Sequence, residues 1–254
     1  MAQKYFFGKG KVFLAQKDPV TGFALALTWL GNVASLPLTL ETESLTHNES
    51  YSGQNLEDVR IDTAKRASFS ARVENFDIDS LAFGLYGNKV TVAGTSVVDE
   101  DLPDDLVVGD EVVTRHPKVT SVVVKDSAGT PATLTLDTHY SIEDATTGRI
   151  KILNLAAYTQ PFTVSYTYGA RKDVGMFINA APIRWLRYEG INLATNTKVL
   201  VELYKVKIDP MSELPLISDG NSVGGYDMKG SALLEDLIAS TDALGRFGRI
   251  SDLA

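Results

Sequence analysis

Apolar and polar residues alternate most strictly between Asp58 and Glu74. Such alternation over so many positions predicts one long β-strand. At ~3.3 Å per residue, a strand over Asp58–Val73 would span roughly 50 Å, several times the usual length. We therefore expect it to project from the body of the subunit, with its apolar face covered by another copy of the protein. The predicted apolar face carries Val59, Ile61, Ala67, Phe69, Ala71 and Val73, and the polar face carries Asp58, Arg60, Asp62, Arg66, Ser68, Ser70, Arg72 and Glu74.

The residues before this strand are expected to form a polar arm. Ser35–Leu40 begins a strand, and the run Glu41–Asp58 that follows is acidic and is predicted to be flexible. The segment Leu45–Asp58 has too few large apolar side chains to offset the entropy lost on ordering. We therefore expect it to order by docking on a neighbouring copy, through the inter-subunit arm residues Leu45, His47, Tyr51 and Leu56.

Shorter alternating stretches predict further strands. In Lys198–Ile208 both faces are apolar, which indicates a strand that is covered on both sides. After Tyr226–Leu234 the chain is predicted to be a tail. Because free termini fray unless they are tied down, we expect a neighbouring copy to hold the stretch 239–254 through Phe247 and Ile250, although a well-packed monomer could hold it as well. The other predicted strands near the two ends are Lys11–Gln16, Phe23–Leu30, Val174–Asn179 and Ile183–Glu189.

One helix is predicted, over Asp77–Tyr86. Its apolar residues Ile78, Leu81, Ala82 and Leu85 fall on one stripe, Asp77 is placed to cap the first turn, and Gly87-Asn88 is placed to end the helix. A single short amphipathic helix in a strand-rich chain usually covers one face or end of a sheet. The predicted fold class is therefore mainly β, a β-sandwich or barrel with one flanking helix and a long projecting arm.

The middle of the chain reads as a separate module. Val97–Asp110 is rich in Asp and Glu and has no Lys or Arg, so we interpret it as a linker or loop. The residues after it are dense in β-branched side chains, with a hairpin predicted over Tyr140–Leu153 and a strand over Phe162–Tyr168. We predict a main domain of residues 1–96 and 171–254, interrupted by an inserted β-module of residues 97–170.

Composition offers no sign of catalysis. The 254 residues include no cysteine, and the three histidines are not at metal-ligand spacing. His47, with Glu43 and Glu49 nearby, reads as an ordinary solvated histidine. The sequence therefore predicts no catalytic, metal or cofactor-binding residues, no cofactor and no enzyme. The N-terminus lacks the features of a signal peptide and no apolar run approaches a membrane span, so we expect synthesis in the cytoplasm. The net charge of −8 argues against a protein that grips nucleic-acid phosphates.

An ordered series of segments over nearly the whole chain resembles the major tail (tail tube) proteins of long-tailed, non-contractile bacteriophages. The series contains no single diagnostic motif, because the family is structural. Its members are Gly10–Ala15, Leu30-Gly31-Asn32, Leu40–Gly53, Arg66–Val73, Leu81–Gly87, Tyr140–Ile152, Phe162–Tyr168, Arg187–Asn192 and Val199–Ile208.

The resemblance implies a tail-tube β-sandwich, six copies of which join their sheets into a ring around a shared inner barrel. Rings would stack into a hollow virion tube, made in the host cytoplasm, through which DNA passes without specific binding. The implied partners are other copies of the chain and the tape-measure, tail terminator and tail-tip proteins. The strand shared between copies would carry Arg60, Asp62, Arg66, Phe69 and Arg72.

Three other classes of protein stay open from the sequence. A secretion-system tube protein has a similar sandwich, but is usually shorter and lacks such an insertion. A cell-surface adhesin or pilus-like β-protein would be expected to carry a signal peptide. A β-rich enzyme is the least favoured, because no catalytic constellation is visible.

Overall fold

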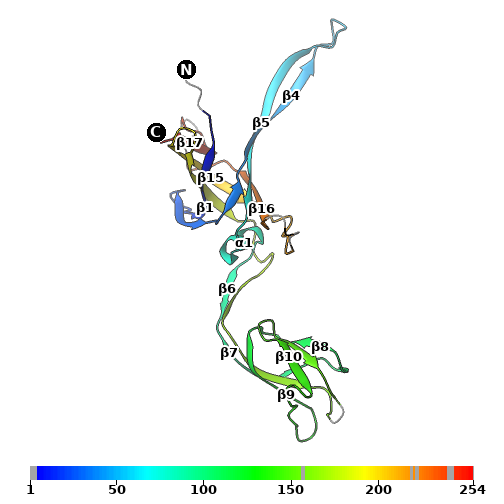
Figure 1. The fold of residues 1–254 in the computed structure, drawn as a ribbon. Coiled ribbons are helices and arrows are strands. Elements are labelled where there is room, and N and C mark those ends of the chain that lie inside the picture. The colour runs from blue at the N-terminus through cyan, green and yellow to red at the C-terminus, as the bar shows by residue number, and fades with distance from the viewer. Residues whose placement is uncertain (1–4, 156–157, 218–219, 221–222, 239–242, 254) are drawn as a thin grey trace. The chain divides into compact units, whose positions relative to one another are not determined.

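The computed structural model describes residues 5–155, 158–217, 220, 223–238 and 243–253. Over these residues the chain is mainly β with one helix, and it divides into two compact units, each with its own core. Unit 1 comprises residues 1–89 and 174–254, and unit 2 comprises residues 90–173 (Figure 1). The chain passes from one unit to the other through the strands β6 (Lys89–Val92) and β13 (Arg171–Val174), which pair with each other.

Unit 1 is built on one curled sheet of nine strands. Seven strands follow in the order β2-β1-β14-β15-β16-β5-β3, while β17 pairs with β15 and β4 pairs with β5. All of these pairings are antiparallel. The strands are β1 (Gly8–Lys17), β2 (Ala24–Trp29), β3 (Val33–Ser35), β4 (Leu38–Asn48), β5 (Glu57–Val73), β14 (Ile183–Asn192), β15 (Thr197–Ile208), β16 (Tyr226–Ala232) and β17 (Gly248–Asp252).

The core of unit 1 lies on one face of this sheet. Residues from both ends of the chain meet there, including Leu14 of β1, Phe69 of β5 and Val206 of β15. A small second cluster, in which Ala15, Trp185 and Tyr204 are buried, forms separately from this core. Strand β15 contributes to both clusters, which agrees with the prediction that it is covered on both sides.

The predicted helix is confirmed as α1 (Ile78–Gly84). Asp77 caps it, with its carboxylate accepting a hydrogen bond from the backbone N–H of Asp79 at 3.1 Å. The residue in the left-handed conformation after the helix is Tyr86, with φ of 52°, rather than the predicted Gly87. Gly87 is instead needed for close approach, since a Cβ there would lie 1.9 Å from the carbonyl oxygen of Gly175.

Unit 2 contains two three-stranded sheets that share one core. One sheet has the order β10-β11-β8 and the other has the order β7-β12-β9. The predicted hairpin after Tyr140 is confirmed as the antiparallel pair β10–β11. Neither sheet pairs with the sheet of unit 1 in the described chain. The strands are β7 (Thr95–Asp101), β8 (Glu111–Val113), β9 (Val119–Lys125), β10 (Tyr140–Asp144), β11 (Arg149–Ile152) and β12 (Thr163–Tyr168).

Three features of the backbone differ from the sequence-based predictions. The acidic stretch Val97–Asp110 begins inside β7 rather than being a linker throughout, because Glu100 has partners: it accepts hydrogen bonds from the Tyr166 hydroxyl at 2.7 Å and the Arg115 backbone N–H at 2.8 Å. The predicted strand Val174–Asn179 ends at Val174. The residues after β16 are not simply a tail, because β17 returns to pair with β15.

Candidate assembly surface

The β4–β5 hairpin projects from the body of unit 1, and most of it has no cover from its own chain (Figure 1). Strand β5 is buried only from Ala67 onward, where β16 pairs with it. Over residues 57–66, all of them described, the strand pairings place only β4 beside β5. The predicted flexible run is largely strand, since β4 extends to Asn48. The large apolar side chains exposed along the hairpin are Leu38, Leu40, Leu45, Tyr51, Leu56, Val59 and Ile61.

A one-residue bulge at Thr63 divides the hairpin in two. Glu43 pairs with Ala64, and the next residue, Ser44, pairs with Asp62, so Thr63 is extra on the β5 side. An extra residue in one strand shifts the alternation of side chains beyond it by one position. The odd-numbered residues of β5 therefore lie on opposite faces of the hairpin before and after the bulge.

Side-chain contacts on the two sides of the bulge agree with this shift. Arg66, before the bulge toward the body, forms an ion pair with Glu43 at 2.9 Å. Arg60, beyond the bulge, donates a hydrogen bond to the hydroxyl of Ser44 at 3.1 Å. Glu43 and Ser44 are consecutive in β4, so their side chains point to opposite faces. The prediction that Arg60 and Arg66 share one polar face is therefore wrong.

The bulge also separates the apolar residues of the hairpin into two patches. Near the body, Leu38 pairs with Phe69 and Leu40 pairs with Ala67. Toward the tip, Leu45 pairs with Ile61, on the other face. We name the exposed pair Leu38 and Leu40 the base patch, and the exposed trio Leu45, Val59 and Ile61 the tip patch. The predicted single apolar face, running from Val59 to Val73, is not formed.

The loop at the tip is organised by Glu49, which is only 4 % exposed. Its carboxylate accepts hydrogen bonds from the backbone N–H groups of Tyr51 and Ser52, each at 2.8 Å, and of Leu56 at 3.4 Å. It also accepts a hydrogen bond from the Ser52 hydroxyl. Bonds from Ser52, joined by those of the other backbone groups, lower the pKa of Glu49 to about 2. The loop therefore has internal order, which the composition of the arm did not indicate.

The other residues predicted for the hairpin lie in different environments. His47 contacts Asp58 across the hairpin at 2.7 Å, rather than Glu43 or Glu49. Asp62 lies beside the bulge. Phe69 is 3 % exposed and belongs to the core of its own subunit, and Arg72 forms an ion pair with Asp227 of β16 at 3.4 Å. Arg72 and Phe69 thus hold β5 to the body, while Arg60 and Asp62 lie on the projecting part.

An apolar groove of about 790 Å³ opens on the core face of unit 1. The base of the hairpin forms part of its wall, through Leu38 and Phe69. Val201 of β15 and Ile250 of β17 also line it, and they are directly paired in the sheet. Ile250 is 68 % exposed, so its side chain is accessible from solvent. The remaining apolar lining residues are Phe6, Val12, Val33, Ala34, Leu36, Leu186, Val199 and Leu203.

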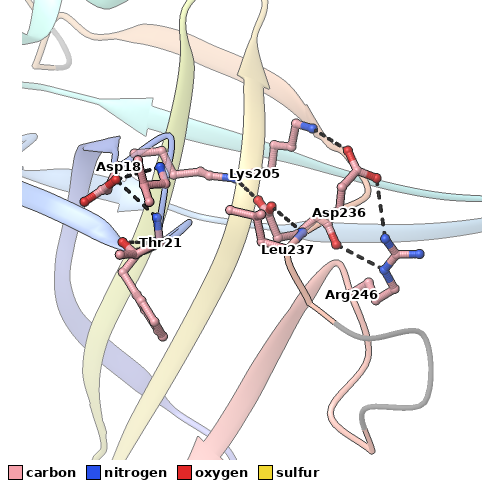
Figure 2. A network of polar contacts seen from close by, with 10 residues as sticks. Asp18, Thr21, Lys205, Asp236, Leu237 and Arg246 are labelled. Atoms are coloured by element: carbon pink, nitrogen blue, oxygen red, sulfur yellow. Dashed lines mark hydrogen bonds and ion pairs between the residues drawn. The ribbon is translucent and has the colours of Figure 1, made fainter.

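The C-terminal part of unit 1 is held by its own chain over its described residues. Phe247 packs against the core, and β17 pairs with β15. Figure 2 shows the polar contacts that fix the preceding segment, in which Arg246 donates to the backbone carbonyl of Glu235 at 3.0 Å and Asp236 contacts Lys205 at 3.4 Å. Of the two predicted tail contacts, Ile250 is therefore the exposed one. Residues 239–242 and 254 of the predicted tail lie outside the described residues.

A family model described as "Protein of unknown function UCP028589" matches residues 5–251. The chain belongs to this family. The match runs through both units, including the projecting hairpin and the groove. A search of curated proteins gives no match. The description of the UCP028589 family states no activity, so the surfaces described above are the basis for proposing a function.

Two further features of the described residues concern metal binding and membrane spanning. In the described part of the chain, no group of three or more His, Cys, Asp or Glu side chains is placed to hold a metal ion. The helix in the described residues is too short to cross a membrane.

Proposed function

We propose that the protein is a structural subunit that polymerises with copies of itself into a hollow tube, of the kind that forms the tail of long-tailed, non-contractile phages. The observation that carries the proposal is the β4–β5 hairpin. It extends away from its own core, exposes apolar side chains on both faces and presents an open strand edge over residues 57–66.

These three features together favour contact with other copies of the chain. Exposed hydrophobic patches on soluble proteins commonly mark interaction sites. An open strand edge is a template for pairing with another chain. A long, flat hairpin that combines both would promote uncontrolled aggregation unless a specific partner covers it. A second copy of the same chain is always available as that partner.

In this proposal the curled sheet of unit 1 is the tail-tube sandwich, and six copies form a ring. Closing the sheets of neighbouring copies into one barrel would remove their open edges. The projecting part of β5, with Arg60 and Asp62, would lie between copies. Stacked rings would then form the tube, and unit 2 would be a module carried by each copy.

The proposed partners follow from the same assembly. A tube of this kind would surround a tape-measure protein, end at tail terminator and tail-tip proteins, and belong to the virion. The net charge of −8 per copy would oppose binding of DNA phosphates during passage. No catalytic step is required of the chain. We expect assembled tubes to show no salt-sensitive retention of DNA.

Electron microscopy of the purified protein tests the proposal. Over a series of rising protein concentrations, sedimentation should show a transition from monomer to large assemblies, and the images should show tubes or stacked rings. A protein that stays monomeric at all concentrations, including after addition of a crowding agent, contradicts the proposal.

A further inference from the structure

We propose that the copies join head to tail, with the tip patch of one copy seated in the apolar groove of the next. This inference rests on the proposed function and deepens it by naming both halves of the contact. The donor half is Leu45, Val59 and Ile61. The acceptor half is the groove wall around Val201 and Ile250.

The donor half is fixed by the bulge at Thr63. If β4 had one more residue opposite Thr63, pairing would be regular and the tip patch would lie on the same face of the hairpin as the base patch, which borders the groove of its own copy. Because β4 lacks that residue, the tip patch lies on the opposite face. The hairpin also carries the tip away from its own body (Figure 1), so a copy cannot place its own tip patch in its own groove.

The acceptor half has the size and the chemistry to receive this patch. Its volume of about 790 Å³ lies within the range of roughly 300–1,000 Å³ that encloses a drug-sized ligand in proteins, so three aliphatic side chains fit. Its walls are mainly aliphatic, and one residue of each charge, Lys9 and Glu74, lines it as well. On the side of the tip patch, Glu43 is paired with Arg66 and Asp58 with His47, so the match between the two halves is apolar.

The small size of the patch favours a repeating assembly over a pair. A standard stable interface takes about 800 Å² from each partner, and three aliphatic side chains supply only a fraction of that area. One such contact does not hold a stable dimer. Because donor and acceptor are different surfaces, each copy is held by two neighbours, and a contact of this type repeats into rings or filaments.

Cysteine crosslinking tests the contact directly, since the native chain has no cysteine. Two single variants are prepared, Ile61→Cys at the tip patch and Ile250→Cys in the groove, with tags of different mass. They are mixed under assembly conditions and treated with a short bismaleimide that joins two thiols. We expect a covalent heterodimer in the mixture, and little product from either variant alone. The double variant should give a ladder of covalent oligomers beyond the dimer.

A Val98→Cys variant mixed with Ile250→Cys gives the background from random collisions, because Val98 is exposed on unit 2. Strong crosslinking of Ile61→Cys to itself would show tip-to-tip pairing and overturn the inference. Tubes in the microscope without the heterodimer would overturn the inference while leaving the proposed function intact. Absence of both assembly and crosslinks would overturn the two together.

Discussion

A single carboxylate, that of Glu49, gives the tip of the hairpin its shape. The segment around Glu49 is polar, and from its composition we expect it to become ordered only when it binds a partner. In the structure Glu49 gathers the backbone N–H groups of Tyr51, Ser52 and Leu56. The loop is therefore shaped before any partner arrives. Pre-shaping lowers the entropy lost on binding, so contacts made by this region keep more of their interaction energy.

Replacing Glu49 by Gln should loosen the tip loop without unfolding the body. A neutral amide accepts weaker hydrogen bonds from these backbone groups than a carboxylate does. The amide protons of Tyr51 and Ser52 should exchange faster, as measured by NMR, while the thermal midpoint of the chain stays unchanged. Glu41→Gln, on an exposed strand position, is the matched control. Unchanged exchange in Glu49→Gln would show that the carboxylate is not what orders the loop.

The pH dependence of the loop follows from the same carboxylate. Folding lowers the pKa of Glu49 from 4.5 to about 2. Its stabilising effect is therefore fully present above pH 4.5 and is lost as the pH falls toward 2. Exchange of the Tyr51 amide, corrected for intrinsic rate, should rise over this window in the native chain. In Glu49→Gln the rise should be absent.

Phe69, which the sequence places on a strand shared between copies, acts in the core of its own subunit. Truncation of a buried Phe to Ala typically costs about 3–5 kcal/mol. We expect Phe69→Ala to lower the free energy of unfolding of unit 1 by about this amount, measured by urea denaturation. Leu40→Ala in the same hairpin should change it by less than about 0.5 kcal/mol, because Leu40 is 74 % exposed. A small effect at Phe69 would contradict its place in the core.

At the scale of elements, periodicity predicted the long strand, the helix and most other strands. It did not predict the bulge, because a bulge changes only one position. A signal was nevertheless present: the proposed apolar face of β5 is interrupted by the polar residues Thr63 and Lys65. The acidic strand β7 does not show in the sequence, because a run of Asp and Glu without Lys or Arg indicates a linker or loop. The partners of Glu100 come from residues far along the chain, and no local pattern shows them.

The groove could not be predicted from the sequence, because its walls are formed by residues that lie far apart along the chain. Its walls come from β1, β3, β4, β5, β14, β15 and β17, with the segment between β3 and β4. These residues read in the sequence as ordinary core positions of separate strands. The sequence indicates Ile250 as a contact residue, but it does not indicate the residues that line the groove beside it.

Inserting one threonine between Glu43 and Ser44, opposite Thr63, tests what the bulge does. The insertion should give Thr63 a partner in β4, restore regular pairing of β4 with β5 and turn the tip patch to the face of the base patch. We expect a folded subunit, by circular dichroism and thermal denaturation, that no longer forms tubes in the electron microscope. Normal tubes from this variant would show that the facing of the tip patch is unimportant for assembly.

A pair of substitutions at the same level of the hairpin controls for indirect effects of the insertion. Ile61→Asp places a charge in the tip patch, whereas Thr46→Asp places one on the opposite face, where the paired residue is Arg60. Both positions are exposed, so neither change should alter the thermal midpoint by much. Only Ile61→Asp should abolish assembly.

At the scale of the whole molecule, the chain contains two cores that share no residue. The sequence placed the inserted module at residues 97–170, and the compact units divide instead at 89/90 and 173/174. The difference arises because β6 and β13 pair with each other at the crossing, where the sequence shows only short apolar runs. Each unit should therefore unfold with its own transition.

Excising unit 2 tests this independence. Residues 90–173 are replaced by a short Gly/Ser turn that joins Lys89 to Val174. We expect the shortened chain to fold with one thermal transition and to assemble as the full chain does, because unit 1 keeps its core, hairpin and groove. Residues 90–173 expressed alone should also fold. Loss of structure in the shortened chain, by circular dichroism, would show that unit 1 depends on the insert.

The β6–β13 pair, through which the chain passes between the two units, also matters for the evolution of such chains. The backbone N–H of Gly175 donates to the carbonyl of Asn88 at 3.3 Å, so the strand that leaves unit 1 and the strand that returns lie side by side. One recombination event at this point exchanges a whole domain and leaves the body in register. If every copy in a polymer carries the insert, that one event changes the inserted module at each repeat.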